Sequence, residues 1–263
     1  MTTATEYYQN GDLENAITAI QSEIKANPAA TSKRAFLVEL LCFAGELDRA
    51  DKQLDIVSTQ EPDAVVSIGF WRQLIRAELS RKEFYIAGRT PEVVNDPGET
   101  INELIRASVE IRAGDLENAA EILNSLEEKR EPLKVICNGK DCDDFRDLDD
   151  LNSGILEVLA NNGKYYWIEL DKINSIEFYP PQRPIDLLWR KAILDVADGP
   201  DGEVFIPTIY FNEEADSESR LGRKTEWTQN ASHPLRGIGL RAFLVGDELM
   251  TILDIQELKF NKE

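Results

Sequence analysis

The hexapeptide Gly11-Asp12-Leu13-Glu14-Asn15-Ala16 occurs a second time, letter for letter, at residues 114–119. A looser copy, Gly-Glu-Leu-Asp-Arg-Ala, occupies residues 45–50, so the first two copies begin 34 residues apart. The second and third copies begin 69 residues apart, which is about two further periods. Self-similarity at this period predicts a stack of helix–turn–helix units.

Each copy has the features of a turn between two helices. Glycine tolerates the left-handed conformation that closes one helix, and an acidic neighbour favours the positive start of the next. Apolar residues then recur at helical spacing, which predicts one buried face for each helix. The three apolar faces are Leu13, Ala16, Ile17, Ile20 and Ile24; Leu47, Ala50, Leu54 and Val57; and Leu116, Ala119, Leu123 and Leu126.

The glycine turn, the small alanine and a closing proline resemble the tetratricopeptide repeat. Pro28, Pro62 and Pro132 follow the three copies at a nearly constant distance. Proline suits the end of a unit because it cannot continue a helix. Ordinary antiparallel helices are the alternative interpretation.

By this resemblance, the first helix of each unit lines a concave face, where a partner's amphipathic helix would bind in a groove. Counting back from each turn places five residues on that face. They are predicted to contact a partner, the alternative being a solvated helix face. These residues are Glu39, Cys42, Gln73, Arg76 and Ser108.

The helical pattern is interrupted once in the first half of the chain. Two prolines and two glycines between residues 84 and 98 favour turns over a long helix. The expected helices span residues 2–10, 13–26, 30–44, 47–59, 63–82, 99–112 and 115–129.

The composition changes after Glu131. The aspartate-rich stretch that follows is expected to be a solvated connector that caps a helix. A short helix is expected from Ile155 to the Asn-Asn-Gly at residues 161–163, where glycine suits a C-terminal cap. Aromatic and β-branched residues then predict strands. The predicted strands span residues 165–168, 175–179, 188–196, 204–210, 225–228, 240–245 and 250–255.

These patterns predict a multi-domain α+β fold. An α-helical, tetratricopeptide-like repeat domain is expected over residues 1–131, followed by the acidic connector over residues 132–150. A small, mostly antiparallel α+β domain is expected over residues 151–263. The strand spacing in this domain favours a barrel-like or curled sheet.

The chain of 263 residues has a formal net charge of −20. This charge argues against binding to nucleic acid or to an anionic membrane, and it suits a basic partner surface. Residues 1–6 lack the features of a signal peptide, and no apolar run reaches the roughly 20 residues of a membrane span. Three cysteines are too few for a disulfide scaffold. A reducing cytoplasm is therefore expected.

The sequence offers few groups for catalysis, so neither an enzymatic activity nor a cofactor is expected. His233 is the single histidine, and a solvated loop side chain is its simpler interpretation. No residue lies in a recognisable nucleophile motif. Residues 141–150 lack the ligand spacing of a calcium loop, and Cys137 and Cys142 lack a second ligand pair for zinc. No metal site is expected.

Tryptophans and arginines occur together in the predicted strands. The tryptophans are Trp167, Trp189 and Trp227, and the arginines are Arg190, Arg223 and Arg241. Both residue types are enriched at the centres of protein interfaces, so the arginines are candidate partner-binding residues. In the alternative interpretation, the tryptophans are core residues and the arginines pair with nearby acids.

The second half also carries an ordered series of short motifs. They are Gly163-Lys164-Tyr165-Tyr166-Trp167-Ile168, Pro180-Pro181, Asp186-Leu187-Leu188-Trp189-Arg190, Gly202-Glu203-Val204-Phe205-Ile206-Pro207, Leu221-Gly222-Arg223-Lys224-Thr225-Glu226-Trp227 and Arg236-Gly237-Ile238-Gly239-Leu240-Arg241. In this order they resemble the ImpE family, also called TagJ or SciE-type proteins. The helical first half fits that family as well.

Members of the ImpE family are accessory proteins of bacterial type VI secretion systems. The resemblance implies a cytoplasmic, non-enzymatic adaptor that binds the N-terminal helix of the sheath small subunit. It would link the sheath to the ATPase that disassembles it. The alternative is a small-ligand-binding or enzymatic β domain carried on a helical repeat scaffold, which would need a pocket that gathers the tryptophans, the arginines and His233. The oligomeric state is left open.

Overall fold

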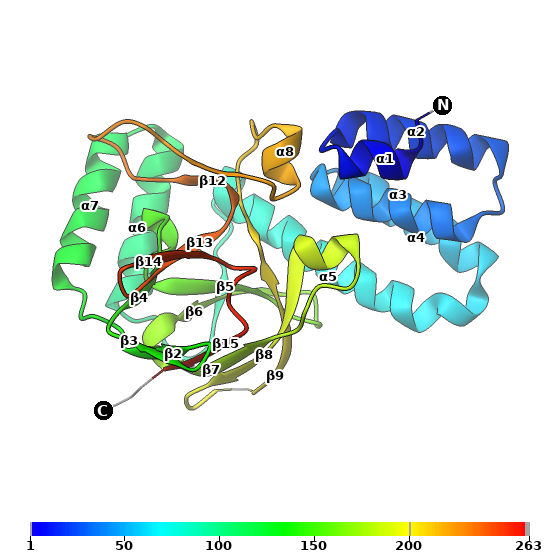
Figure 1. Ribbon diagram of the computed structural model, residues 1–263. Helices are drawn as coiled ribbons and strands as arrows, with labels where there is room; N and C mark the ends of the chain where they lie inside the picture. The colour runs from blue at the N-terminus through cyan, green and yellow to red at the C-terminus, as the bar shows by residue number, and fades with distance from the viewer. Residues whose placement is uncertain (1, 200, 261–263) are drawn as a thin grey trace.

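The computed structural model describes residues 2–199 and 201–260 of the chain. Helices fill the first half of these residues and strands dominate the second, which confirms the predicted α+β fold (Figure 1). The helices are α1 (Ala4–Gln9), α2 (Leu13–Ala26), α3 (Thr31–Phe43), α4 (Leu47–Gln60), α5 (Val65–Ala87), α6 (Glu99–Ala113), α7 (Leu116–Lys129) and α8 (Ser217–Arg220). The 3₁₀ turns are η1 (Pro62–Ala64), η2 (Asp150–Asn152), η3 (Leu170–Lys172) and η4 (Pro184–Leu187). Among these helices, none is long and apolar enough to cross a membrane.

The repeated hexapeptides form the turns that the sequence predicts. Gly11, Gly45 and Gly114 have φ angles of 82°, 71° and 82°, in the left-handed region that glycine adopts readily. The Asp12 side chain accepts a hydrogen bond from the backbone N–H of Asn15 at 3.1 Å, which caps the start of α2. Every predicted apolar residue of α2 and α4 is buried, whereas two of the four in α7 are half-buried.

Helix α5 is longer than the sequence predicts. It runs past residue 82 to Ala87 and closes at Gly88, whose φ angle is 75°. The Phe84 ring is buried and packs edge-on against the ring of Trp167, with 4.6 Å between the ring centroids. This contact with the second half of the chain stabilises the last turn of α5, so the interruption begins only after Ala87.

The strands form one large sheet and two small ones. Their bounds are β1 (Glu92–Val93), β2 (Val135–Cys137), β3 (Lys140–Cys142), β4 (Phe145–Asp147), β5 (Ile155–Leu159), β6 (Tyr165–Glu169), β7 (Ile173–Phe178), β8 (Trp189–Val196), β9 (Asp201–Pro207), β10 (Ile209–Tyr210), β11 (Thr225–Trp227), β12 (Gly237–Leu240), β13 (Ala242–Val245), β14 (Glu248–Thr251) and β15 (Glu257–Phe260). The nine-stranded sheet has the order β1-β6-β5-β9-β8-β7-β15-β2-β3. Only the β1–β6 pair in it is parallel. The small sheets have the orders β10-β12-β11 and β14-β13-β4.

The prediction of a short helix that starts at Ile155 is wrong, because residues 155–159 form β5 inside the large sheet. All five residues of this strand are buried, so it lacks the alternation of a strand with one solvated face. Periodicity alone does not distinguish such an apolar run from a buried helix.

The prediction of a solvated acidic connector at residues 132–150 is also wrong. Strands β2, β3 and β4 lie within it, so the stretch belongs to the sheet domain. Asp147 and Asp149 are buried, not solvated, and they form ion pairs with Arg241 and Arg236. Partners distant in sequence therefore make the burial of these aspartates possible.

The sheet domain lies between two groups of helices. Helices α1–α4 lie on one side of it and α6–α7 on the other, and the long α5 runs from one group to the other along the sheet (Figure 1). One cluster of buried residues includes Leu40 and Leu74 from the helices together with Trp167 and Trp189 from the sheet. A second cluster lies within the sheet domain. The helices and the sheet thus share a hydrophobic core.

Candidate partner-binding site

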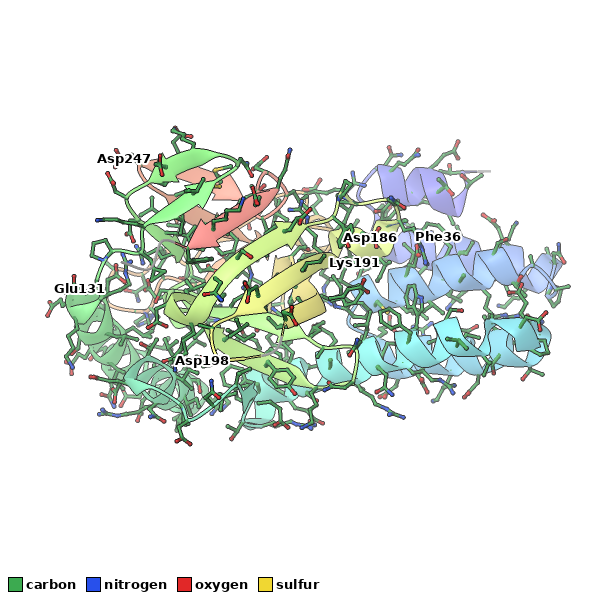
Figure 2. All side chains as sticks on the ribbon, turned by 90° about the horizontal axis from the view of Figure 1, so that it is seen from below. Phe36, Glu131, Asp186, Lys191, Asp198 and Asp247 are labelled. Atoms are coloured by element: carbon green, nitrogen blue, oxygen red, sulfur yellow. The ribbon has the colours of Figure 1, made fainter. Side chains whose placement is uncertain are left out.

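Glu39, predicted to face a partner, contacts the chain's own sheet domain. The residue is 4% exposed, and its Oε1 accepts a hydrogen bond from Nε of Arg183 at 3.1 Å. Burial raises the pKa of Glu39, and the hydrogen bond from Arg183 opposes that rise. Helix α3 contacts η4, and Figure 2 labels Phe36 on α3 and Asp186 on η4. The sheet domain therefore covers this part of the repeat.

Of the other four residues predicted to lie on the concave face, two lie next to a turn of the sheet domain and two are buried. Gln73 and Arg76 lie on α5 next to the β5–β6 turn, since a Cβ on Gly163 would be 2.4 Å from Gln73 Oε1 and 3.6 Å from Arg76 Cβ. Cys42 and Ser108 are buried, and burial raises the pKa of the Cys42 thiol. Only Arg76 of the five is exposed. The chain's own sheet domain fills much of the concave face.

Two of the three predicted arginines lie in the interior of the sheet domain. Arg190 is 3% exposed and donates from Nη1 to the Ile255 carbonyl at 2.8 Å. Burial lowers its pKa to about 10. Arg241 is completely buried, as are the rings of Trp167 and Trp189. These residues stabilise the domain and form no exposed aromatic and arginine surface.

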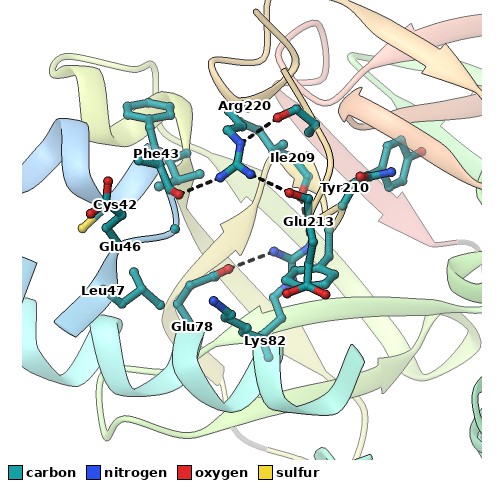
Figure 3. A pocket seen from close by; sticks show the side chains of 17 residues that line it. Cys42, Phe43, Glu46, Leu47, Glu78, Lys82, Ile209, Tyr210, Glu213 and Arg220 are labelled. Carbon is teal, nitrogen blue, oxygen red and sulfur yellow. Dashed lines mark hydrogen bonds and ion pairs between the residues drawn. The ribbon is translucent and has the colours of Figure 1, made fainter. Parts of the chain in front are cut away.

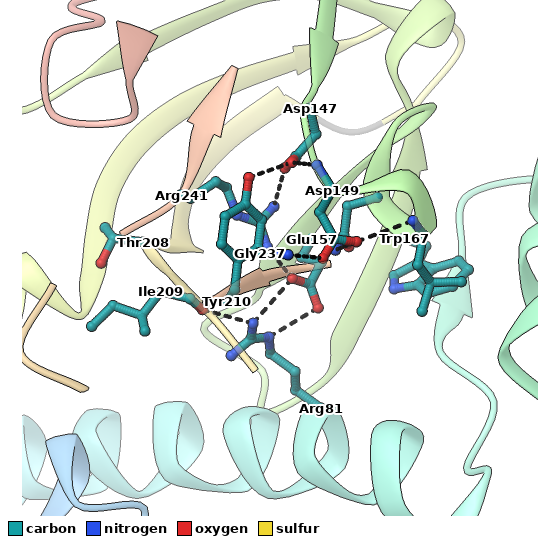
Figure 4. A network of polar contacts seen from close by, with 12 residues as sticks. Arg81, Asp147, Asp149, Glu157, Trp167, Thr208, Ile209, Tyr210, Gly237 and Arg241 are labelled. Atoms are coloured by element: carbon teal, nitrogen blue, oxygen red, sulfur yellow. Dashed lines mark hydrogen bonds and ion pairs between the residues drawn. The ribbon is translucent and has the colours of Figure 1, made fainter. Parts of the chain in front are cut away.

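The carboxylate of Glu157 is the centre of a buried polar network between α5 and the sheet (Figure 4). Arg81 of α5 donates to it from Nε at 2.9 Å and from Nη2 at 3.1 Å, and Arg241 forms an ion pair with it. The Tyr85 and Tyr165 hydroxyls donate to it at 3.0 and 2.5 Å. Burial alone would raise the pKa of Glu157, but the two guanidinium groups hold it at about 2.

Asp147 extends this network to β4. Its Oδ1 accepts hydrogen bonds from the Tyr210 hydroxyl at 2.6 Å and from the Asp149 backbone N–H at 2.9 Å. Its Oδ2 lies 3.4 Å from Nη1 of Arg241 and accepts no hydrogen bond from any residue that the structure describes. Burial raises the pKa of Asp147 to about 7, although Arg241 opposes the rise. The network holds α5 on the sheet and places the elements around it.

Two arginines near α8 attach the sheet domain to the ends of repeat helices. Arg223, the third predicted arginine, donates to the carbonyl groups of Tyr8 and Gln9 at the end of α1. Arg220 donates from Nη1 to the Ala44 carbonyl at the end of α3, at 2.6 Å. Guanidinium groups suit these positions because the last carbonyls of a helix lack partners within it. Arg223 therefore contacts the chain's own repeats.

A groove lies where α8 and the residues before it face the repeat turns, and we call it the junction groove. Figure 3 shows one of its two hollows. The two adjoining hollows have volumes of 340 and 460 Å³, and they share Ala44, Glu46, Ala215 and Arg220 in their walls. Apolar side chains from α2, α4 and the sheet domain contribute to the lining. They are Leu13, Ile17, Leu47, Leu188, Ile209 and Phe211.

Charged side chains lie along the rim of the junction groove. Glu14 and Glu213 are exposed, and in the described part of the chain neither side chain forms an ion pair. Lys82 lines the same groove, also without an ion pair to a described residue. Of the apolar lining residues, Phe211 is half-buried and the others are buried. Phe211 and the charged rim together offer an apolar and a polar contact to an amphipathic helix.

The sequence alone did not reveal the junction groove. Leu13 and Ile17 have the spacing of a buried helix face, and only the folded structure brings residues 209–220 next to them. A signal for this pairing is absent from a single sequence because the two walls are about 200 residues apart along the chain.

The residues proposed for a ligand-binding or catalytic β domain do not meet in one pocket. Trp167, Trp189 and Arg241 are buried in the core, whereas His233 lies in a loop with its Nε2 3.1 Å from Nδ2 of Asn230. Within residues 2–199 and 201–260, no three His, Cys, Asp or Glu side chains are grouped to hold a metal ion.

Comparisons with known proteins point to one family. Residues 139–259 match the model of the ImpE protein family. The type VI secretion system accessory component TagJ of Pseudomonas aeruginosa is 28% identical, over 98% of this chain and 90% of that protein. The crystal structure of a protein from Vibrio parahaemolyticus superposes with a TM-score of 0.92 at 27% identity, covering 99% of this chain and 98% of the other. The motifs of the sheet domain and the full-length similarity agree: residues 139–259 match the ImpE family, and the chain as a whole is similar to a type VI secretion accessory component.

Proposed function

We propose that this protein is a cytoplasmic, non-enzymatic adaptor that binds the N-terminal helix of the sheath small subunit in the junction groove. The observation that carries the proposal is the groove itself, on a chain similar over 98% of its length to a type VI secretion accessory component. In this function the adaptor links the sheath to its disassembly ATPase.

The arrangement of the repeats supports this location of the partner helix. The concave face used by many helical repeats is covered here by contacts such as the Glu39–Arg183 ion pair. The junction groove lies outside those contacts and opens between α2, the α3–α4 turn and α8. A partner helix bound there would pack its apolar side on Phe211 and place its polar side along the charged rim, without separating the two parts of the chain.

Calorimetry of the full chain with a synthetic N-terminal peptide of the sheath small subunit from the same genome tests the proposal. We expect saturable binding by the unaltered protein. We expect Thr18→Arg to weaken it at least tenfold, about 1.4 kcal/mol, because the arginine would fill the groove. Thr59→Arg is the matched control, since both hydroxyls donate to the carbonyl four residues before them and Thr59 lies outside the groove.

Two outcomes would contradict different parts of the proposal. Absence of binding by the unaltered protein would contradict the sheath partner. Equal binding by Thr18→Arg and Thr59→Arg would retain that partner but remove the junction groove as its site. The circular dichroism spectra of both variants should match that of the unaltered protein, because both positions are exposed on helices.

A further inference from the structure

Four of the helices α1 to α7 end at a glycine with a positive φ angle. These glycines are Gly11, Gly45, Gly88 and Gly114. The last carbonyl groups of a helix lack partners within it and carry a partial negative charge, so they attract cationic donors. An arginine fits two such carbonyls at once because its guanidinium group presents several donors.

Three of the four helix ends receive an arginine from elsewhere in the chain. The bonds run from Arg223 to Tyr8 and Gln9, from Arg220 to Ala44, and from Arg112 to Phe84. Arg220 and Arg223 belong to one short segment, residues 216–223, which therefore covers the first two turns.

The fourth turn, at Gly114, is open. A Cβ built on Gly114 would have no atom within 4 Å, whereas one on Gly11 would lie 3.4 Å from Glu218 and 3.5 Å from Arg223. Across residues 2–199 and 201–260, no arginine side chain donates a hydrogen bond to the carbonyl of Ile111 or Arg112. These two carbonyls correspond to those that Arg223 binds in the first turn.

The first and fourth turns are built from the same six residues. The Asp12 side chain accepts a hydrogen bond from the backbone N–H of Asn15 at 3.1 Å. The Asp115 side chain accepts one from the backbone N–H of Asn118 at 3.2 Å. The helix that follows begins with the same Leu-Glu-Asn-Ala in both copies. The turn itself is therefore repeated, although Ile111 and Arg112 stand where the first copy has Tyr8 and Gln9, so the Tyr8 ring under the Arg223 guanidinium has no counterpart. Residues 216–223 cover only the first turn.

The open copy is also the more acidic one. Glu117 and Glu121 are exposed on α7, and neither forms an ion pair with a described residue. Glu121 stands where the first copy has Thr18, which borders the hollow next to α8. A basic segment would gain charge complementarity here that α8 does not have at the first turn.

We propose that the turn at Gly114 binds an arginine-bearing, basic segment of a partner protein in the way that the first turn binds residues 216–223. The arginine would donate to the carbonyls of Ile111 and Arg112, and neighbouring basic groups would face Glu117 and Glu121. The α6–α7 turn, which forms this site, lies across the sheet domain from α1 to α4 (Figure 1). It gives the protein a second interface, separate from that of the proposed function.

The chain's own segment provides the probe. A capped peptide with the sequence of residues 216–225, which contains Arg220, Arg223 and Lys224, is titrated to millimolar concentration into the isotope-labelled full chain. We expect saturable shifts of the amide signals of residues 110–121. A peptide with both arginines replaced by alanine should leave these signals unchanged.

Two single charge reversals complete the experiment. Glu121→Lys should weaken peptide binding about tenfold. Glu128→Lys, two turns further along the same helix, should change it less than twofold. The absence of saturable shifts at residues 110–121, equal binding of the alanine peptide, or equal effects of the two reversals would each overturn the proposal. Because Glu121 lies outside the junction groove, Glu121→Lys should not alter sheath-peptide binding, so the two proposals fail separately.

Discussion

At the scale of single residues, Glu157 forms hydrogen bonds or ion pairs with α5 and with two parts of the sheet domain. Its partners are Arg81, Tyr85, Tyr165 and Arg241. Burial of an ion pair is costly, and removal of one partner leaves the other charges without compensation in the interior. The network therefore makes the helix-to-sheet contact depend on one carboxylate.

We expect Glu157→Gln to lower the free energy of unfolding by about 3–5 kcal/mol, because Arg81 and Arg241 would lose their shared counter-charge. Urea unfolding at pH 7 measures the loss. Glu203→Gln removes an exposed acid that pairs with Lys191 and should cost less than about 1 kcal/mol. Similar losses in the two variants would contradict the importance of the network.

Asp147 should make the stability depend on pH. Burial raises its pKa to about 7, above the value of about 3.9 in an unfolded chain, so the folded protein binds this proton more tightly. Protonated, neutral Asp147 stabilises the folded protein fully below about pH 4, and this stabilisation is lost as the pH rises to about 7. Relative to Asp147→Asn, the unaltered protein should lose up to about 4 kcal/mol over that range.

Urea unfolding of the two proteins at several pH values from 4.5 to 8 measures this difference. The difference should fall with rising pH and level off above pH 7. A difference that is constant across the range would show that the Asp147 carboxyl does not titrate there.

At the scale of elements, α5 has one glycine in its interior and another that caps its end, with opposite requirements. Gly88 ends the helix with a φ angle of 75°, and a Cβ there would lie 3.1 Å from Nη2 of Arg112. Gly69 is an exposed interior residue of the same helix, and a Cβ there would meet no atom within 4 Å. The same substitution should therefore act in opposite directions at the two positions.

We expect Gly88→Ala to destabilise the protein by about 1 kcal/mol or more, because alanine is strained at positive φ. Gly69→Ala should stabilise it by about 0.5–1 kcal/mol, because glycine in a helix interior costs conformational entropy. Thermal unfolding of the pair measures both. A rise in melting temperature for Gly88→Ala would contradict the cap.

The elements also show which parts of the fold the sequence predicts. The apolar faces of α2 and α4 were predictable because each helix buries one stripe at a regular spacing. Strand β5 was not, because it is buried on both faces. The role of Asp147 was hidden because its partners, Tyr210 and Arg241, lie far away in sequence.

The candidate site was less predictable than the fold. Arg223 was predicted to bind a partner but holds the end of α1, and Glu39 pairs with Arg183. A single sequence shows which residues are charged, but it does not show which charges meet inside the folded chain.

At the scale of the whole molecule, the sheet domain occupies the space that a helical repeat often leaves for its partner. Leu40 and Leu74 of the helices share a buried cluster with Trp167 and Trp189 of the sheet. Separation of the two parts would expose this apolar surface to water.

We therefore expect the chain to unfold in one transition. Tryptophan fluorescence and far-ultraviolet circular dichroism should give the same midpoint in urea, since the helices and the sheet depend on a common core. Two separated midpoints would contradict the shared core and would identify the repeat as an independent domain.

The central claim is that the partner helix binds in the junction groove and not on the concave face. Amide hydrogen exchange of the full chain, with and without saturating sheath peptide, tests it most directly. We predict that the peptide slows exchange in residues 13–21, 42–47 and 209–220, which line the groove. Slower exchange confined to residues outside these segments, with the peptide bound, would contradict the claim.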